Sequence, residues 1–128
     1  MLTDFGVGRQ MRDSPQSTIT RTGEIFGTPH YMSPEQFRGK DVGPPSDVWS
    51  LGATFYEMFT GRRPYEGRTV FEVVRRMASN RPRHVLALRP SLPRELGALV
   101  MHMLMRDARK RPSMDVVVRM LGALAQEI

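Results

Sequence analysis

Apolar side chains recur every three or four residues in four stretches after residue 45, and each stretch predicts an amphipathic helix. The first of these helices begins at Ser46 as its N-cap and ends at Gly61. Trp49 and Tyr56 lie on a second side of it, which is typical of a buried helix. Its inward positions are Val48, Leu51, Phe55, Met58 and Phe59.

The other three helices follow the same spacing rule. We expect one from a Thr69 cap to Ala78, one from about Pro93 to Met105, and one that begins after Ser113. Their inward positions are Val70, Val73, Val74 and Met77; Leu96, Leu99, Val100, Met103 and Leu104; and Met114, Val117, Val118, Leu121 and Leu124. The pattern therefore predicts a mainly α fold.

The segment 7–30 has no helical period. It is rich in Ser, Thr, Arg and Gly, with turn-forming residues at Asp13-Ser14-Pro15 and at Gly23. We expect one long loop here, and loops of this length in a compact domain are usually functional or disordered.

Composition limits the class of protein. The 128 residues suit one domain, and 40% of them are hydrophobic, which allows a core. The absence of Cys excludes disulfides, thiol catalysis and Cys-based zinc sites. No apolar run approaches the ~20 residues that span a bilayer, so we expect no membrane segment and a cytoplasmic protein.

The net charge of +6 raises nucleic acid as a possible partner. However, the basic residues are scattered from Arg9 to Arg119 without a dense run. A basic helical nucleic-acid binder stays an alternative that a salt-dependent affinity for DNA would reveal. We expect no nucleic-acid partner.

Four short strings stand in a fixed order: DFG at 4–6, GTPHYMSPE at 27–35, DVWSLG at 47–52 and RDARKRPS at 106–113. Together they resemble the C-terminal half of a eukaryotic-type serine/threonine protein kinase, and the SPEQ ending is similar to bacterial members. The resemblance implies the large-lobe portion of the kinase fold over 1–128. It divides the chain into a DFG, activation-loop and substrate-pocket region at 1–35 and a helical subdomain at 36–128.

The resemblance gives the DFG triplet a role in cofactor binding. It implies that Asp4 holds the Mg²⁺ that bridges the ATP phosphates, as a hard oxygen ligand for a hard cation. It implies that Phe5 packs differently in active and inactive arrangements, and that Gly6 allows the backbone to rotate between them. Out of this context, the triplet would be an ordinary turn.

Residues 7–26 match the family's activation loop. The resemblance makes Thr20 and Thr22 candidates for phosphorylation by another copy of the kinase, because added phosphate can order a loop against arginines. The alternative is that these threonines only make the loop polar. Gly27, Thr28 and Tyr31 match the pocket for the substrate residue that follows the phosphoacceptor, and Thr28 is the choice of kinases that act on Ser or Thr.

Three charged residues match structural positions of the family. The resemblance implies a buried ion pair between Glu35 and Arg111, which are 76 residues apart, whereas the alternative is two solvated charges. It implies that Asp47 accepts N–H groups of the catalytic loop. Ser33 replaces the family's usual Ala, and Ala108 its usual Pro.

The chain lacks several strings that an active kinase needs. No glycine-rich phosphate loop, strand Lys in the right context or H-R-D catalytic loop occurs in the 128 residues. We therefore expect a kinase fragment whose N-lobe and catalytic base are absent, through a misplaced start or a truncated gene. The catalytic set is incomplete, so no kinase activity is expected from this chain alone.

The resemblance implies ATP and Mg²⁺ as cofactors of the intact parent, and neither is expected to bind this chain tightly. Its partners would be protein substrates or another kinase copy. The alternative function is a catalytically dead binding module that docks partners through 28–35 and the helix 69–78. Such a fragment is also expected to fold marginally, because the helix 48–59 would expose apolar surface that the absent part covers.

Overall fold

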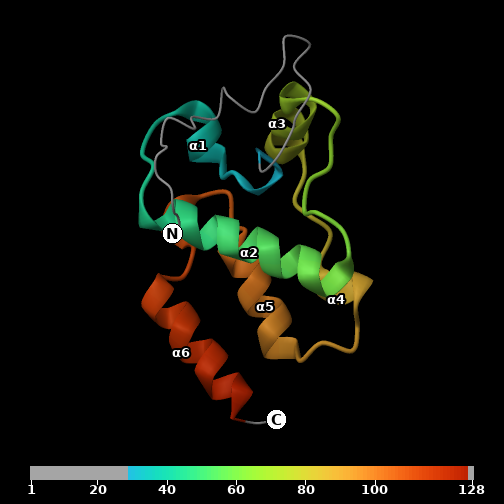
Figure 1. Cartoon of the computed structure of the whole chain (residues 1–128), viewed down its shortest axis with the longest axis vertical. Helices are drawn as coiled ribbons and strands as arrows, with labels where there is room; N and C mark the ends of the chain where they lie inside the picture. Colours follow the sequence, from blue (N-terminus) through green and yellow to red (C-terminus); the bar gives the residue numbers. More distant parts are fainter. Residues whose placement is uncertain (1–28, 127–128) are drawn as a thin grey trace, which may run out of the picture.

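A computed structural model of the chain describes residues 29–126, and this part is built entirely from helices joined by turns and loops (Figure 1). None of these helices is both long and apolar enough to cross a membrane. The elements are η2 (Pro29–Tyr31), α1 (Pro34–Arg38), α2 (Pro44–Thr60), α3 (Val70–Ser79), α4 (Val85–Leu88), α5 (Arg94–Met103), η3 (Ala108–Lys110) and α6 (Met114–Ala125).

Helix α2 is the centre of the fold. Figure 1 shows α5 against one side of it, while α1 and α3 lie on the other. One apolar cluster gathers Trp49 and Tyr56 with residues from α3, α4 and α5. A second cluster joins Val48 to Leu99 and Met103 of α5 and to α6. The prediction of a buried helix at this position is confirmed, because Val48, Trp49 and Tyr56 are at most 1% exposed.

The predicted start of α2 was wrong by three residues. Gly43 is the N-cap, and Pro44 and Pro45 begin the helix, where a missing N–H costs nothing. Ser46 lies in the first turn, and its hydroxyl oxygen accepts from the Gly43 N–H at 3.4 Å. The C-terminal end was predicted correctly, since Gly61 adopts the left-handed conformation (φ 75°) that glycine tolerates best.

Two other predicted caps are confirmed. The Thr69 hydroxyl accepts from the Glu72 N–H at 3.1 Å and starts α3. The Ser113 hydroxyl accepts from the Val116 N–H at 3.2 Å and starts α6. Each cap satisfies one of the N–H groups that a helix start leaves without a partner.

Three positions that were predicted to face inward are exposed. The exposed fractions are 65% for Met58, 63% for Val118 and 36% for Val74. All three fit the helical period, but within the described residues no neighbouring element fully covers those edges of α2, α3 and α6. Helix α5 also ends at Met103, two residues before the predicted end, while Leu104 beyond it stays buried.

Four short elements were not predicted, among them η3 (Ala108–Lys110). Helix α1 starts at a capping box, in which the Gln36 side chain accepts from the Ser33 N–H and the Ser33 hydroxyl accepts from the Gln36 N–H. Helix α4 has only four residues, too few to show a period. The end of the predicted loop 7–30 contains η2, and the rest of that loop lies outside the described residues.

A glycine in α2 allows α2 and α5 to approach closely. A Cβ added at Gly52 would lie 2.7 Å from the Met103 Cβ, a contact that cannot be relieved by turning a side-chain tip. We expect Gly52→Ala to lower the free energy of unfolding by about 1–3 kcal/mol through overpacking. Urea unfolding followed by circular dichroism would measure this change.

Gly122→Ala is the matched control for that substitution. Gly122 lies inside α6, and nothing stands within 4 Å of its added Cβ. Alanine should therefore stabilise α6 by about 0.5–1 kcal/mol through helix propensity alone. Equal effects of the two substitutions would contradict the close packing of α2 on α5.

Candidate functional site

A buried ion pair joins Glu35 in α1 to Arg111, which directly follows η3. The Arg111 guanidinium donates to the Glu35 carboxylate through Nη1 at 2.7 Å and through Nη2 at 3.0 Å. The two side chains are 0% and 2% exposed. The pair that the resemblance implied is thus present, with the bidentate geometry that suits arginine and a carboxylate.

Every N–H of the Arg111 guanidinium has an acceptor. Nε donates to the Met105 carbonyl at 2.7 Å, Nη1 to the Pro45 carbonyl at 2.9 Å, and Nη2 to the Arg106 carbonyl at 3.3 Å. With the two bonds to Glu35, these use all five donors of the side chain. The arginine therefore ties α1, the start of α2 and the segment before η3 together.

Two neighbours complete the surroundings of the pair. The Ser46 hydroxyl donates to Glu35 Oε2 at 2.7 Å, and the guanidinium of Arg111 lies 5.0 Å from the centre of the Trp49 ring. Trp49 in turn stacks on Tyr65 with 6.3 Å between the ring centres. A cation over a Trp face in a desolvated site adds attraction beyond that of the ion pair.

These contacts determine the charge state of Glu35. Burial opposes ionisation of the carboxyl group, but the hydrogen bonds from Arg111 and Ser46 outweigh it and lower the pKa of Glu35 from 4.5 to about 2. Glu35 is therefore an anion at neutral pH, and the pair is a true ion pair.

The residues just before α1 are hydrogen-bonded to α2 and to the loop before α3. The Tyr31 hydroxyl donates to the Glu57 carboxylate, and the Ser50 hydroxyl donates to the Tyr31 carbonyl at 2.9 Å. The neighbouring Glu57 carboxylate, with some burial, raises the pKa of Tyr31 above its usual 10. The buried His30 ring bonds the Gly67 carbonyl through Nε2 at 3.1 Å. The segment Pro29–Arg38 is thus held at both ends.

The other candidate residues fall into two groups. Asp47 lies in the first turn of α2 and is exposed. Asp4, Phe5, Gly6, Thr20, Thr22, Gly27 and Thr28 lie outside the described residues. Within 29–126, no group of three His, Asp or Glu side chains could hold a metal ion.

Sequence reasoning missed two partners in this site. The bond from Ser46 to Glu35 and the bond from Tyr31 to Glu57 join residues 11 and 26 positions apart, which no local pattern reveals. The only local signal was the hydroxyl of Ser46, which the sequence pattern favoured as a helix cap.

Comparison with known proteins agrees with this geometry. The protein kinase domain family matches residues 1–121. The serine/threonine-protein kinase PkaA of Streptomyces coelicolor is 38% identical over the whole chain, and pkn2 of Myxococcus xanthus is 37% identical over 87% of it. The human kinase Nek5 is 32% identical over 92%.

The chain spans 22% of the length of PkaA, 14% of pkn2 and 16% of Nek5. The match over most of the chain, the helical fold and the order of the four strings agree with one another. This chain belongs to the protein kinase domain family and is related to the serine/threonine protein kinases of bacteria.

Proposed function

We propose that this chain supplies the substrate-binding part of a kinase that transfers the γ-phosphoryl group of ATP to Ser or Thr of a protein. The observation that carries the proposal is the rigid attachment of Pro29–Arg38, which includes Tyr31 of the candidate substrate pocket and follows directly on Gly27 and Thr28. Tyr31 is bonded to α2 at one end of this segment, and Glu35 is bonded to Arg111 at the other.

Rigid attachment is what a phosphoacceptor site requires. Phosphoryl transfer depends on positioning and on charge stabilisation, so a substrate segment must lie in a fixed place relative to ATP. Four side-chain tethers hold this segment: His30 to Gly67, Tyr31 to Glu57, Ser50 to Tyr31, and Arg111 to Glu35. Thr28, just before them, favours Ser or Thr as the acceptor.

The same proposal assigns the phosphate chemistry to groups outside this segment. Asp4 would bind the Mg²⁺ of ATP, and a phosphate on Thr20 or Thr22 would order the loop before the pocket. A cytoplasmic location belongs to this proposal, because ATP is the donor. The 128 residues contain no H-R-D string and so no catalytic base, and we infer that they transfer no phosphate on their own.

Phosphotransfer assays test this function. We expect the isolated chain with Mg-ATP and a Ser- and Thr-rich basic protein to incorporate no phosphate. Fused behind the N-lobe and catalytic loop of a bacterial relative, the chain should restore transfer to Ser or Thr. In that fusion, Asp4→Ala should lower the rate about 10²–10³-fold through loss of one electrostatic contact, while Asp13→Ala serves as the matched control.

Two results would contradict the proposal. Turnover by the isolated chain that disappears with Asp4→Ala would show a complete active site within it. A fusion that melts cooperatively but transfers no phosphate, while the relative itself is active, would favour the binding-module alternative.

A further inference from the structure

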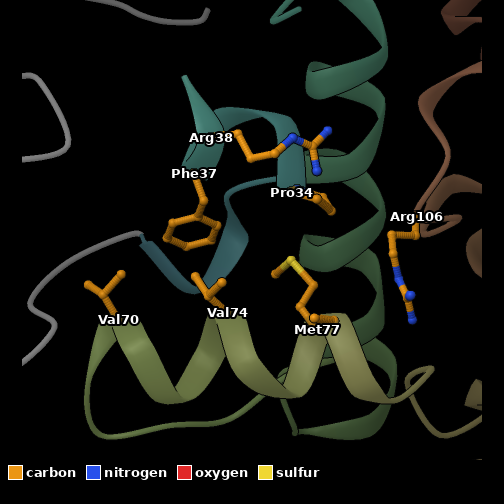
Figure 2. A pocket seen from close by; sticks show the side chains of 8 residues that line it. Pro34, Phe37, Arg38, Val70, Val74, Met77 and Arg106 are labelled. Atoms are coloured by element: carbon orange, nitrogen blue, oxygen red, sulfur yellow. The ribbon is translucent and has the colours of Figure 1, made fainter. Parts of the chain in front are cut away.

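The described part of the molecule has an apolar groove between α1 and α3, to which neither Glu35 nor Arg111 contributes a lining residue. It encloses about 340 Å³, and Figure 2 shows Pro34 and Phe37 of α1 facing Val70, Val74 and Met77 of α3 across it. Its size is at the lower end of ligand pockets in proteins. It can therefore accept a few apolar side chains.

The apolar surface continues beyond the groove. Val74 is 36% exposed, and Phe71, which neighbours it on the helix at a spacing of three, is 75% exposed. Connected apolar surface of this kind marks interaction sites on soluble proteins more often than it occurs by chance. The exposed side chains and the groove together form a larger surface than a small ligand needs.

The rim of the groove is positively charged. Arg38 and Arg106 line it, and no acidic residue does (Figure 2). Within residues 29–126, neither arginine forms an ion pair, and the Arg106 side chain donates only to the Asn80 carbonyl at 3.5 Å. Two cations beside an apolar cavity would attract carboxylates that flank an apolar side chain.

We propose that the groove between α1 and α3 binds an acidic, amphipathic segment of another protein, whose apolar side chains enter it while its carboxylates meet Arg38 and Arg106. The proposal does not depend on phosphoryl transfer. A second copy of this chain fits less well, because two chains of net charge +6 repel each other. A membrane surface fits less well, because the apolar side chains line a hollow that a flat surface would not fill.

A peptide of defined chemistry tests the charge preference. The probe is a labelled 16-residue helical peptide with Leu repeating every three or four residues and Glu elsewhere, titrated with the 128-residue chain by fluorescence anisotropy. We expect saturable binding that weakens with added salt. A peptide with Lys in place of every Glu should bind at least about tenfold more weakly. Equal binding of the two peptides would overturn the proposal.

Substitutions locate the binding to the groove. Val74→Glu should weaken binding of the Glu peptide at least about tenfold, and Arg38→Glu should also weaken it and reduce its salt dependence. The matched controls lie on α6: Val118→Glu, at a 63% exposed valine, and Arg119→Glu. Both controls should bind as the unchanged chain does. Thermal melts show which variants are folded. If Val74→Glu does not fold, Arg38→Glu still tests the groove, because it changes an exposed residue.

Other occupants would give different results. Sedimentation as a dimer that Val74→Glu converts to a monomer would assign the groove to a second copy. Binding to phosphatidylserine vesicles that requires Val74, without binding to the Glu peptide, would assign it to a membrane. Absence of all binding, or equal losses in the α6 controls, would also overturn the proposal.

Discussion

Replacing Arg111 with leucine should lower the free energy of unfolding by about 3–5 kcal/mol, because the Glu35 carboxylate would stay buried without its partner. The carbonyls of Pro45, Met105 and Arg106 would lose their donor as well. Urea unfolding at pH 7 would measure the loss. Trp49, the one tryptophan of the chain, lies against Arg111 and gives a local fluorescence signal.

Arg109→Leu is the control for this prediction. Arg109 pairs with Asp107 at 3.1 Å, but its side chain is 90% exposed. Solvent-exposed ion pairs contribute little to stability, so the control should change the free energy of unfolding little. Similar losses in both variants would show that burial of the Glu35–Arg111 pair does not determine its effect.

A double variant separates the buried charge from the lost packing. Glu35→Met combined with Arg111→Leu removes both charges and keeps apolar volume at the site. We expect it to be less destabilised than the sum of the two single variants, because no unpaired charge remains. A strictly additive double variant would contradict the direct coupling that the 2.7 Å contact implies.

The second large effect is a dependence on pH. The native pKa of Glu35 is about 2, against an ordinary 4.5, so the folded state keeps this carboxylate ionised where the unfolded state binds a proton. The shift corresponds to about 3 kcal/mol of stability. This contribution is fully present above pH ~5, and it is lost as the pH falls from 4.5 towards 2.

The comparison with Glu35→Gln isolates this contribution. At pH 7 the natural chain should be the more stable of the two, and the difference should shrink steadily below pH 4.5 as Glu35 takes up its proton. Glu72 and Asp107 also have lowered pKa values, but they are present in both proteins and cancel. Stability curves that run parallel from pH 7 to pH 2.5 would contradict the assigned pKa.

The predictable parts of the fold were those that local chemistry determines. Thr69 and Ser113 could be identified as caps because each precedes an apolar period and bonds an N–H three residues later. Ser46 looked the same in sequence, yet its hydroxyl donates to Glu35, which comes from another element. The Pro44-Pro45 pair that starts α2 was the better signal.

Burial was harder to predict than helix formation. The 3.6-residue period shows that Met58 and Val118 could face a neighbour, but not whether one covers them. The ion pair of Glu35 and Arg111 followed from the family resemblance and not from spacing, because 76 residues separate its partners. The carbonyl groups that accept from Arg111 are placed by the folded backbone, so neither the resemblance nor the spacing predicted them.

The separation of Glu35 from Arg111 also matters while the chain is being made. Synthesis adds roughly 5–20 residues per second, so Glu35 leaves the ribosome roughly 4–15 s before its partner 76 residues later. During that interval the carboxylate has no cation that would let it be buried, and α1 has no permanent place on α2. The pair can therefore form only after residue 111 has emerged, and a pause in translation before that residue would prolong exposure of the unfinished core to chaperones and proteases.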